Sequence, residues 1–309
     1  MRIVYMGTPD IASAILKDLI NSRHDIIAVV TQPDKPKGRG GKVQYTPVKE
    51  VALEHNIAVY QPIKVREEGF LEILKDLNPD IIVVAAFGQI LPQSLLDIPK
   101  LACICVHASL LPKYRGAAPI QWSIIDGEEK TGITIIHMDA GIDTGDMIMR
   151  EEVIIDKKET AGTLHEKLAV CGGSLLLKAL DAIEDGNCPR EKQDDSKANY
   201  VKVLTKEFGH IDFSKSAVEI ERLIRGLNPW PSAYGFLEGK TLKIWDADVV
   251  SEDISGEVGE IVGVTKDSIL VQTGKDLLAI KELQLEGKKR MPCDAFLRGY
   301  HIEVGTKIN

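Results

Sequence analysis

The chain has 309 residues, of which 44% are hydrophobic and 27% charged, and these ordinary proportions exclude disordered and collagen-like classes. The net charge of −8 argues against broad, nonspecific binding to nucleic acid, but it leaves room for a local basic patch. The N-terminus does not read as a signal peptide and no apolar run reaches the ~18 residues of a membrane span, so we expect a soluble, cytoplasmic protein.

The first half of the chain alternates short apolar runs with amphipathic stretches. Five runs predict buried strands, because they are short and mostly β-branched: 2–6, 25–30, 80–86, 102–107 and 132–138. Helical spacing or good helix formers occupy 10–21, 47–55, 67–77 and 117–126. This alternation predicts an α/β fold, a Rossmann-like, mostly parallel sheet with helices on both faces. Such sheets bind ligands at the carboxyl ends of their strands.

The second half changes character after a long predicted helix over 160–185, which we expect to begin at Thr160. Residues 187–200 are polar and aperiodic, and 215–227 predicts another helix. Short strands then predict a small C-terminal β-barrel, at 241–249, 259–264, 268–273 and 277–285. We therefore place the first domain at 1–189, a linker at 190–206 and the second domain at 207–309.

A histidine and several aspartates follow two of the predicted strands. His107 ends the strand over 102–107, and the acidic loop 139–146 follows the strand over 132–138. We expect both strands to leave the sheet at the same edge, where these side chains would converge. A carboxylate beside an imidazole holds its tautomer and favours its protonated form. From the residues alone His107 is either catalytic or structural, and the acidic loop also suits a turn or a divalent-metal site.

The turn after the first strand contains Gly7, Thr8 and Pro9, and we expect Thr8 or Asp10 to cap the helix that follows. It lacks the G-x-G-x-x-G spacing of dinucleotide-binding loops, which argues against a nicotinamide enzyme. The five cysteines are odd in number and lack metal-ligand spacing, so we predict reduced cysteines and no metal.

Two basic clusters stand out in this acidic chain. Residues 34–49 carry five lysines and arginines against one acid, with glycines at 38, 40 and 41, which indicates a mobile, positively charged loop. The second cluster is 288–290. For either cluster a solvated surface is the simplest interpretation.

Six segments, in order along the chain, resemble the methionyl-tRNA formyltransferase family. They are MGTPD, TQPDKPKGRGGK, HASLLPKYRGAAPIQ, MDAGIDTGDM, LNPWP and LEGKKRM. The resemblance runs from residue 1 to about residue 307. The pattern H-x-S-L-L-P with a downstream D-x-G-x-D-T-G-D is specific for folate-dependent formyltransferases. The glycine-rich basic loop is the mark of the tRNA enzymes among them.

The resemblance implies that 10-formyltetrahydrofolate gives its formyl group to the α-amine of methionine on initiator tRNA, in translation initiation. It assigns catalysis to His107 and Asp143. It places the folate site at Phe87, Gly88, Gln89, Ile90, Leu91, Ser109, Leu110, Leu111 and Pro112. It assigns tRNA contacts to Arg39, Lys37, Lys42, Gly7, Thr8 and Pro9, with an OB-like second domain gripping the tRNA. We expect a monomer that needs no metal.

Cys105 departs from the family pattern N-x-H, which has an asparagine two residues before the histidine. Attack of the amine on the formyl carbon creates an oxyanion that needs hydrogen-bond donors, and a thiol is a weaker donor than an amide. Three interpretations stay open. His107, water or a backbone N–H replaces the missing donor; the enzyme is slow or specialised; or Cys105 itself accepts the formyl group as a thioester.

Two other functions compete with this one. An amino-sugar-nucleotide formyltransferase shares both domains but gives no reason for the basic loop. A catalytically weakened tRNA-binding paralogue explains Cys105, but it has no use for His107, Asp143 and the folate segments. Formylation of glycinamide ribonucleotide fits less well, because that enzyme typically has no second domain.

Overall fold

The computed structural model describes residues 1–37, 42–252 and 256–309, and it divides into two compact units. Unit 1 consists of Met1–Pro119, Lys130–Ile154 and His165–Val201. Unit 2 consists of Ile120–Glu129, Ile155–Leu164 and Lys202–Asn309. The domain boundaries that we placed at 189 and 206 stay a prediction. The contacts within unit 1 nevertheless include the stretch up to Val201, where β11 (Tyr200–Val201) pairs with β8 (Arg115–Gly116).

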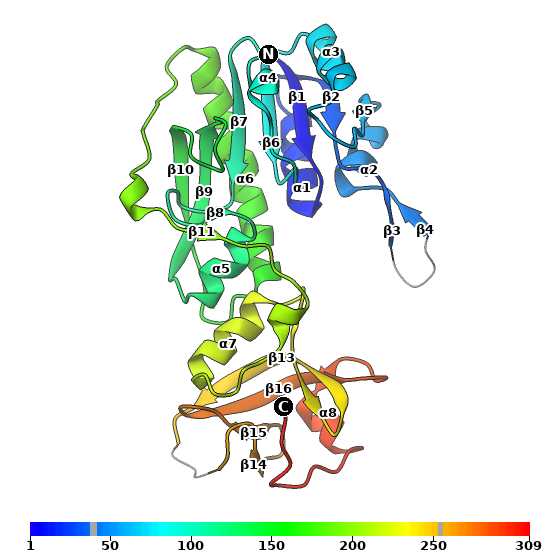
Figure 1. The fold of residues 1–309 in the computed structure, drawn as a ribbon, viewed down its shortest axis with the longest axis vertical. Helices are drawn as coiled ribbons and strands as arrows, with labels where there is room; N and C mark the ends of the chain where they lie inside the picture. The colour runs from blue at the N-terminus through cyan, green and yellow to red at the C-terminus, as the bar shows by residue number, and fades with distance from the viewer. Residues whose placement is uncertain (38–41, 253–255) are drawn as a thin grey trace. The chain divides into compact units, whose positions relative to one another are not determined.

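Unit 1 is built on a seven-stranded sheet in the order β10-β9-β7-β6-β1-β2-β5 (Figure 1). Its strands are β1 (Arg2–Gly7), β2 (Asp25–Val30), β5 (Val59–Tyr60), β6 (Ile81–Ala85), β7 (Ala102–His107), β9 (Lys130–His137) and β10 (Met147–Ile154). The pairs from β5 to β7 are parallel. The predicted Rossmann-like, mostly parallel sheet is confirmed, and all five predicted strands are present.

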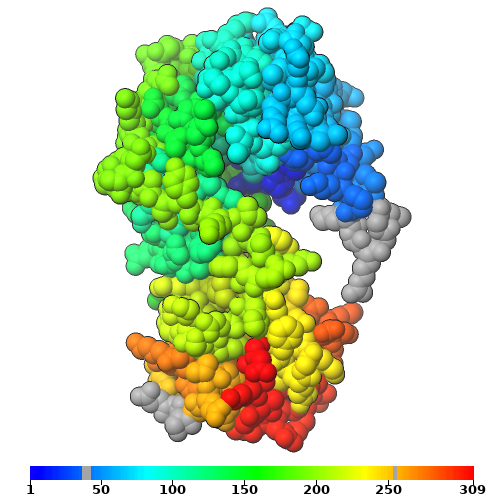
Figure 2. Space-filling model, in the orientation of Figure 1, coloured from blue at the N-terminus to red at the C-terminus, as the bar shows by residue number. Residues whose placement is uncertain are grey.

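Helices cover both faces of this sheet. On one face, α1 (Asp10–Ile20) and α6 (Ala161–Glu184) lie together, because a Cβ on Gly172 would contact Ile15 of α1 and Val106 of β7. On the other face, one buried apolar cluster joins alternate strand residues to α3 (Glu68–Leu77) and α4 (Gln93–Leu96). Figure 2 shows these segments of unit 1, from blue to green, packed into one continuous body.

Smaller elements complete unit 1. They are α2 (Pro47–Glu54), the hairpin β3 (Lys35–Lys37) and β4 (Lys42–Gln44), and the short 3-10 helix η1 (Asp195–Lys197). The predicted start of the long helix at Thr160 is confirmed, since its hydroxyl accepts a hydrogen bond from the Thr163 N–H. The predicted cap on α1 is wrong. Pro9 is the N-cap residue and no side chain caps this helix, because the Thr8 hydroxyl donates instead to the Phe87 carbonyl.

The direction of β9 contradicts one expectation. β9 runs antiparallel to both β7 and β10, so the carboxyl ends of β7 and β9 lie at opposite edges of the sheet. An apolar strand buried on both faces looks the same in either direction, and the sequence therefore does not reveal its sense. The acidic loop therefore reaches His107 only because it turns back from the end of β9 toward the end of β7.

Unit 2 is an antiparallel sheet in the order β12-β13-β16-β15-β14, with β17 beside β16. Its strands are β12 (Ala233–Leu237), β13 (Lys240–Val250), β14 (Ile261–Val264), β15 (Ile269–Gln272), β16 (Leu277–Leu285) and β17 (Met291–Pro292). Its helices are α5 (Pro119–Ile125), the 3-10 helix η2 (Glu207–Gly209), α7 (Ala217–Gly226) and α8 (Cys293–Leu297). A capping box of Ser216 and Glu219 starts α7.

The last residues of the chain close this sheet into a barrel. Ile308 bridges to Leu237 of the edge strand β12, and Lys307 bridges to Glu260 beside the other edge strand, β14. The Asn309 carbonyl accepts from the Phe236 N–H, and the Thr306 carbonyl accepts from the Ile261 N–H. Both open edges are thereby paired, which removes the exposed strand edges of an open sheet. Among the described residues, every helix is too short or too polar to cross a membrane.

Candidate active site

The candidate site begins at the end of β7, where His107 is the last residue of the strand. Side chains two residues apart in a strand share a face, so Cys103, Cys105 and His107 point to the side of the sheet covered by α3 and α4. His107 is buried, at 7% exposure. Its imidazole is therefore held by protein groups.

Asp143 meets His107 from the loop between β9 and β10. Its carboxylate oxygen Oδ1 lies 3.5 Å from Nδ1 of His107. The other oxygen, Oδ2, accepts a hydrogen bond of 2.8 Å from the Gly116 N–H. One oxygen is thus fixed by the backbone while the other faces the imidazole. The 3.5 Å separation exceeds a good hydrogen bond, so the two groups face each other without a short bond between them.

The second ring nitrogen of His107 also faces an oxygen. Nε2 lies 2.9 Å from the Tyr114 carbonyl oxygen. A doubly protonated imidazole can donate to the carbonyl at one end and to the carboxylate at the other. Protein oxygens therefore face both nitrogens of this ring and fix its orientation.

Cys105 belongs to the same group. It is 9% exposed, and burial raises the pKa of its thiol well above the usual value, with the nearby Asp143 carboxylate and Cys103 adding to the effect. A thiol with such a raised pKa stays protonated at neutral pH and is a poor nucleophile. This argues against a formyl thioester at Cys105 and leaves the two interpretations in which the thiol is a weak donor.

A small cavity of about 110 Å³ opens beside Asp143. It is lined by Gln89, Ile90, Leu91, Ile136, Met138, Asp139, Gly141, Ile142 and Asp143. The loop after β6 and the loop after β9 form its walls, and Ile90 and Ile142 are exposed apolar side chains at its edge. Apolar walls with a few polar groups are typical of sites that hold a small organic molecule.

The structure brings part of the predicted folate segments to this cavity. Residues 89–91 line it, whereas Phe87 is buried in the apolar cluster and Gly88 takes a left-handed φ of 86°. The Gln89 side chain is already engaged, since its oxygen accepts from the Val65 N–H. The lining therefore comes from this segment and the acidic loop.

The segment 109–112 supports the loop after β7 and is absent from the lining of this cavity. The Ser109 hydroxyl donates to the Lys113 carbonyl, and its own carbonyl accepts from the Thr134 hydroxyl. Leu111 is buried in the same apolar cluster as Cys105, and the Leu110 side chain is half-buried. The bond between Leu111 and Pro112 is cis.

The residues predicted to contact tRNA are not gathered into one site by the described contacts. Gly7 ends β1, and Thr8 connects the next turn to Phe87. The backbones of Lys37 and Lys42 pair across the β3–β4 hairpin. Arg39 lies outside the described residues.

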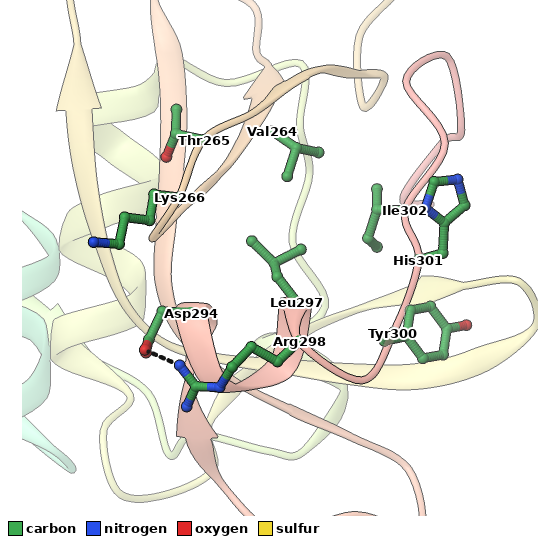
Figure 3. A pocket seen from close by; sticks show the side chains of 9 residues that line it. All are labelled: Val264, Thr265, Lys266, Asp294, Leu297, Arg298, Tyr300, His301 and Ile302. Atoms are coloured by element: carbon green, nitrogen blue, oxygen red, sulfur yellow. Dashed lines mark hydrogen bonds and ion pairs between the residues drawn. The ribbon is translucent and has the colours of Figure 1, made fainter.

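A larger hollow, of about 420 Å³, lies within unit 2 (Figure 3). It is lined by Val264, Thr265, Lys266, Asp294, Leu297, Arg298, Tyr300, His301 and Ile302. Arg298 pairs with Asp294 at 2.7 Å, and Figure 3 shows this ion pair at its edge. The hollow contains none of the predicted catalytic residues, and we therefore assign the chemistry to the smaller cavity despite its size.

One group of side chains elsewhere in unit 1 has metal-binding chemistry. Candidate ligand atoms of His24, Asp181 and Glu184 lie within 4.8 Å of one another. Arg23 already pairs with both carboxylates at 2.7 Å. An arginine in this position satisfies the acids without an ion, so we assign no function to this group.

Sequence reasoning missed the groups that hold the His107–Asp143 pair. The Tyr114 carbonyl and the Gly116 N–H belong to the backbone, and backbone groups leave no side-chain signal. Tyr114, Gly116 and Asp143 all have a positive φ, which places these peptide groups toward the pair. The one signal in the sequence was the glycine at 116, a residue type that favours tight backbone contacts. In the structure a Cβ at this position would lie 2.7 Å from the Val201 carbonyl.

A Rossmann-like sheet, with a buried histidine–carboxylate pair beside a cavity at its loops, is typical of the class of enzymes that bind a small organic ligand. Comparison with known proteins narrows the class. Residues 1–180 match the formyl transferase family, and residues 203–301 match the formyl transferase C-terminal domain. The chain belongs to the formyl transferase family.

Its relatives cover the whole chain. A protein named methionyl-tRNA formyltransferase from Lachnospira eligens is 53% identical over 100% of this chain and 99% of its own length. One of the same name from Clostridioides difficile is 53% identical over the full length of both. A solved N-formyltransferase from Helicobacter canadensis, in complex with folinic acid and dTDP-3-aminofucose, shares the fold. Its TM-score is 0.69 and its identity 21%, covering 90% of this chain and 98% of that one.

Proposed function

We propose that this chain is a cytoplasmic, monomeric enzyme that transfers the formyl group of 10-formyltetrahydrofolate to the α-amine of methionyl initiator tRNA. The observation that carries the chemistry is the buried His107–Asp143 pair, 3.5 Å apart beside the cavity. The choice of tRNA as acceptor is supported by the 53% identity to proteins of that name over the whole chain.

The reaction exchanges one C–N bond for another. The neutral α-amine attacks the formyl carbon, and a tetrahedral intermediate with a negatively charged oxygen forms. The bond to the folate nitrogen then breaks. The amine loses one proton in the process and the folate nitrogen gains one. Donors aimed at the oxyanion and a group that carries the proton are what the protein must supply.

His107 fits both tasks. Its two nitrogens face Asp143 and the Tyr114 carbonyl, so the ring is held in a fixed place from which it can donate to the oxyanion or pass a proton to the leaving nitrogen. Asp143 is a partner of fixed orientation, because the Gly116 N–H occupies its other oxygen. The placement of both groups thus comes from contacts that are already present in the folded chain.

The remaining predicted residues take binding roles in this proposal. We assign 87–91 and 109–112 to the folate side of the site: residues 89–91 line the cavity, and 109–112 form the loop behind His107. The basic loop with Lys37, Arg39 and Lys42, and the turn at 7–9, contact the tRNA. A positively charged loop suits the phosphate backbone of a nucleic acid.

An amino-sugar nucleotide is the second candidate acceptor. The solved neighbours with this chemistry share the fold at 21% identity, well below the tRNA-named relatives. A catalytically weakened paralogue is the third candidate, and its supporting observation is the cysteine at 105 in place of asparagine.

The test is a formyl-transfer assay with purified chain, 10-formyltetrahydrofolate, and either methionyl initiator tRNA or a dTDP-amino sugar. We expect transfer to the tRNA that is lost in His107→Ala and kept in His55→Ala. His55 is a matched control because it is a histidine at the end of α2, bonded to the Val51 carbonyl. Transfer to the sugar nucleotide, or none with tRNA still bound, would replace the proposal with the corresponding alternative.

A further inference from the structure

A buried arginine holds the segment that follows α6 against the loop after β7. Arg115 is 2% exposed, and its guanidinium donates to three side chains: Gln193, Asp195 and Tyr200. The backbone joins the same segment to the loop, because the Arg115 N–H donates to the Asn199 carbonyl. These contacts fall in the stretch that the sequence predicted to be a linker.

Gln193 connects this arginine to the loop of Asp143. Its amide oxygen accepts from Nε and Nη2 of Arg115, at 3.1 and 2.9 Å. Its amide nitrogen donates to the backbone carbonyls of Asp143 and Gly145, at 2.8 Å each. All four contacts are satisfied in one orientation of the amide, since a flipped amide would direct its donors at the guanidinium.

The loop at this point has little freedom of its own. Asp143 takes a left-handed φ of 54°, which a residue with a side chain rarely adopts. A Cβ on Gly145 would lie 1.7 Å from the His137 carbonyl, so the chain passes tightly over the end of β9. The two carbonyls bonded to Gln193 belong to Asp143 and Gly145, on either side of Thr144. Holding the Asp143 carbonyl in place restricts rotation of its backbone, and with it the direction of its side chain.

The side chain of Asp143 is fixed from the same place. Its Oδ2 accepts from the Gly116 N–H, and Gly116 is the residue after Arg115. β8, which contains both residues, pairs with β11 at Tyr200 and Val201. The backbone of Asp143 is therefore held through Gln193, and its carboxylate through Gly116, by one pair of neighbouring residues.

We propose that Gln193, held by Arg115, is a positioning residue for the transfer reaction: it fixes the backbone of Asp143 so that the carboxylate faces His107. This inference rests on the proposed function, in which Asp143 and His107 act together. Gln193 is not itself a lining residue of the cavity, and its effect on the reaction passes through its hydrogen bond to Asp143, which is one.

If Gln193 only helped to dock the segment after α6, its substitution would be expected to have a different effect on the reaction. Arg115 keeps Asp195 and Tyr200 as partners when Gln193 changes, so the segment stays docked. If docking of this segment were the whole contribution, substitutions at 193 and 195 would change kcat to a similar extent. If Gln193 orients Asp143, only the substitution at 193 lowers kcat.

The test compares Gln193→Glu with Asp195→Ala. The glutamate keeps the size and the acceptor for Arg115, but it turns an oxygen toward the carbonyls of Asp143 and Gly145 and repels them. We expect kcat to fall on the order of 10- to 100-fold, since small misplacements of catalytic groups have effects of this size. The KM values for the folate and for the tRNA should stay unchanged. Asp195→Ala removes an 83% exposed partner of Arg115 and should keep the wild-type kcat.

A double-mutant cycle separates positioning from general damage. In the background of Asp143→Asn, Gln193→Glu should cause little further loss, because the group that it positions is already impaired. An equal fold-loss in both backgrounds, or a wild-type kcat in folded Gln193→Glu, would overturn the inference. Gln193→Ala, which removes the clamp without adding charge, gives the same comparison if the glutamate variant fails to fold.

Amide hydrogen exchange of residues 143–146 provides a readout that does not depend on the substrate. Exchange should rise in both Gln193 variants and stay at the wild-type rate in Asp195→Ala. A wild-type chain that fails to formylate tRNA refutes the proposed function. Unchanged exchange in the Gln193 variants refutes the positioning role whether or not the chain formylates tRNA.

Discussion

Replacing Cys105 with asparagine should make the enzyme faster. The side chain lies on the face of β7 that carries His107, and it is close enough to Asp143 for the carboxylate to raise the pKa of the thiol, after burial as the main cause. An amide at this position would offer an N–H to the reacting centre, where the thiol is a weak donor.

The size of the gain follows from the value of one oxyanion donor. Removing such a donor lowers kcat by about 10²–10³, which is about 2.7–4 kcal/mol. Because the thiol, water and backbone groups recover part of this, we expect Cys105→Asn to raise kcat on the order of 10- to 100-fold. Asparagine also introduces a polar group beside Leu111 and Ile136, and an unpaired amide there would lower the free energy of unfolding by about 1–3 kcal/mol.

Single-turnover transfer at saturating folate and tRNA measures the effect on the chemical step, and thermal unfolding measures the cost in stability. Cys103→Asn is the matched control. Cys103 lies two residues before Cys105 on the same face of β7 and is 5% exposed. Its thiol contacts the Met138 sulfur at 3.7 Å. It should lose stability without gaining rate. A folded Cys105→Asn protein with an unchanged or lower rate would refute the reasoning and show that other groups already serve the oxyanion.

Three further predictions concern the pair, the backbone and the buried thiols. Asp143→Asn keeps the size of the side chain but loses its charge, so steady-state kinetics should show kcat lower by about 10²–10⁴ with little change in KM. Gly132→Ala places a Cβ 2.0 Å from the Glu151 carbonyl and should lower the free energy of unfolding by about 2–4 kcal/mol, whereas Gly69→Ala, with open space in α3, should raise it by about 0.5–1 kcal/mol; urea titration measures both. Burial raises the pKa of the Cys293 thiol to about 11 from its ordinary 9.0, so its contribution to stability is complete below pH 9 and is lost as the pH rises toward 11. Urea midpoints at pH 8 and pH 10 should therefore differ less in Cys293→Ala than in the wild type, and equal differences would contradict the assignment.

The periodicity of the sequence was sufficient to predict where the strands lie, but it did not reveal in which direction each strand runs in the sheet. Each of the five apolar runs in the first half became a strand of one sheet, because β-branched runs of that length are stable where both faces are covered. The same property hides the sense of β9. Its antiparallel direction was decided by the pairing with β7, in which Ile104 faces His137 and His107 faces Thr134.

The sequence predicted a barrel in the second half, but for a related reason it did not reveal the segment that closes it. Residues 305–309 have no apolar alternation, and their contribution is made mainly through backbone hydrogen bonds to both edge strands. Backbone groups are the same at every position, so a short segment of this kind cannot be distinguished from a loop. The polar stretch 187–200 likewise gave no sign of its contacts with the loop after β7, because Gln193 and Asn199 make them as single residues without a periodic pattern.

Backbone strain near the site favours an enzyme over a binding paralogue. Ala86, Tyr114, Ala118 and Asp143 all have φ between 44° and 60°, in the loops after β6, β7 and β9. Such conformations cost on the order of 1–3 kcal/mol each for residues with a side chain. Two of these residues belong to the site: the Tyr114 carbonyl faces His107, and Asp143 is itself the carboxylate of the pair. A protein that merely bound tRNA would gain nothing from this strain, whereas an enzyme gains a histidine and a carboxylate that are in place before the substrates arrive. We therefore favour the interpretation in which Cys105 changes the rate of an active enzyme, which the Cys105→Asn experiment tests.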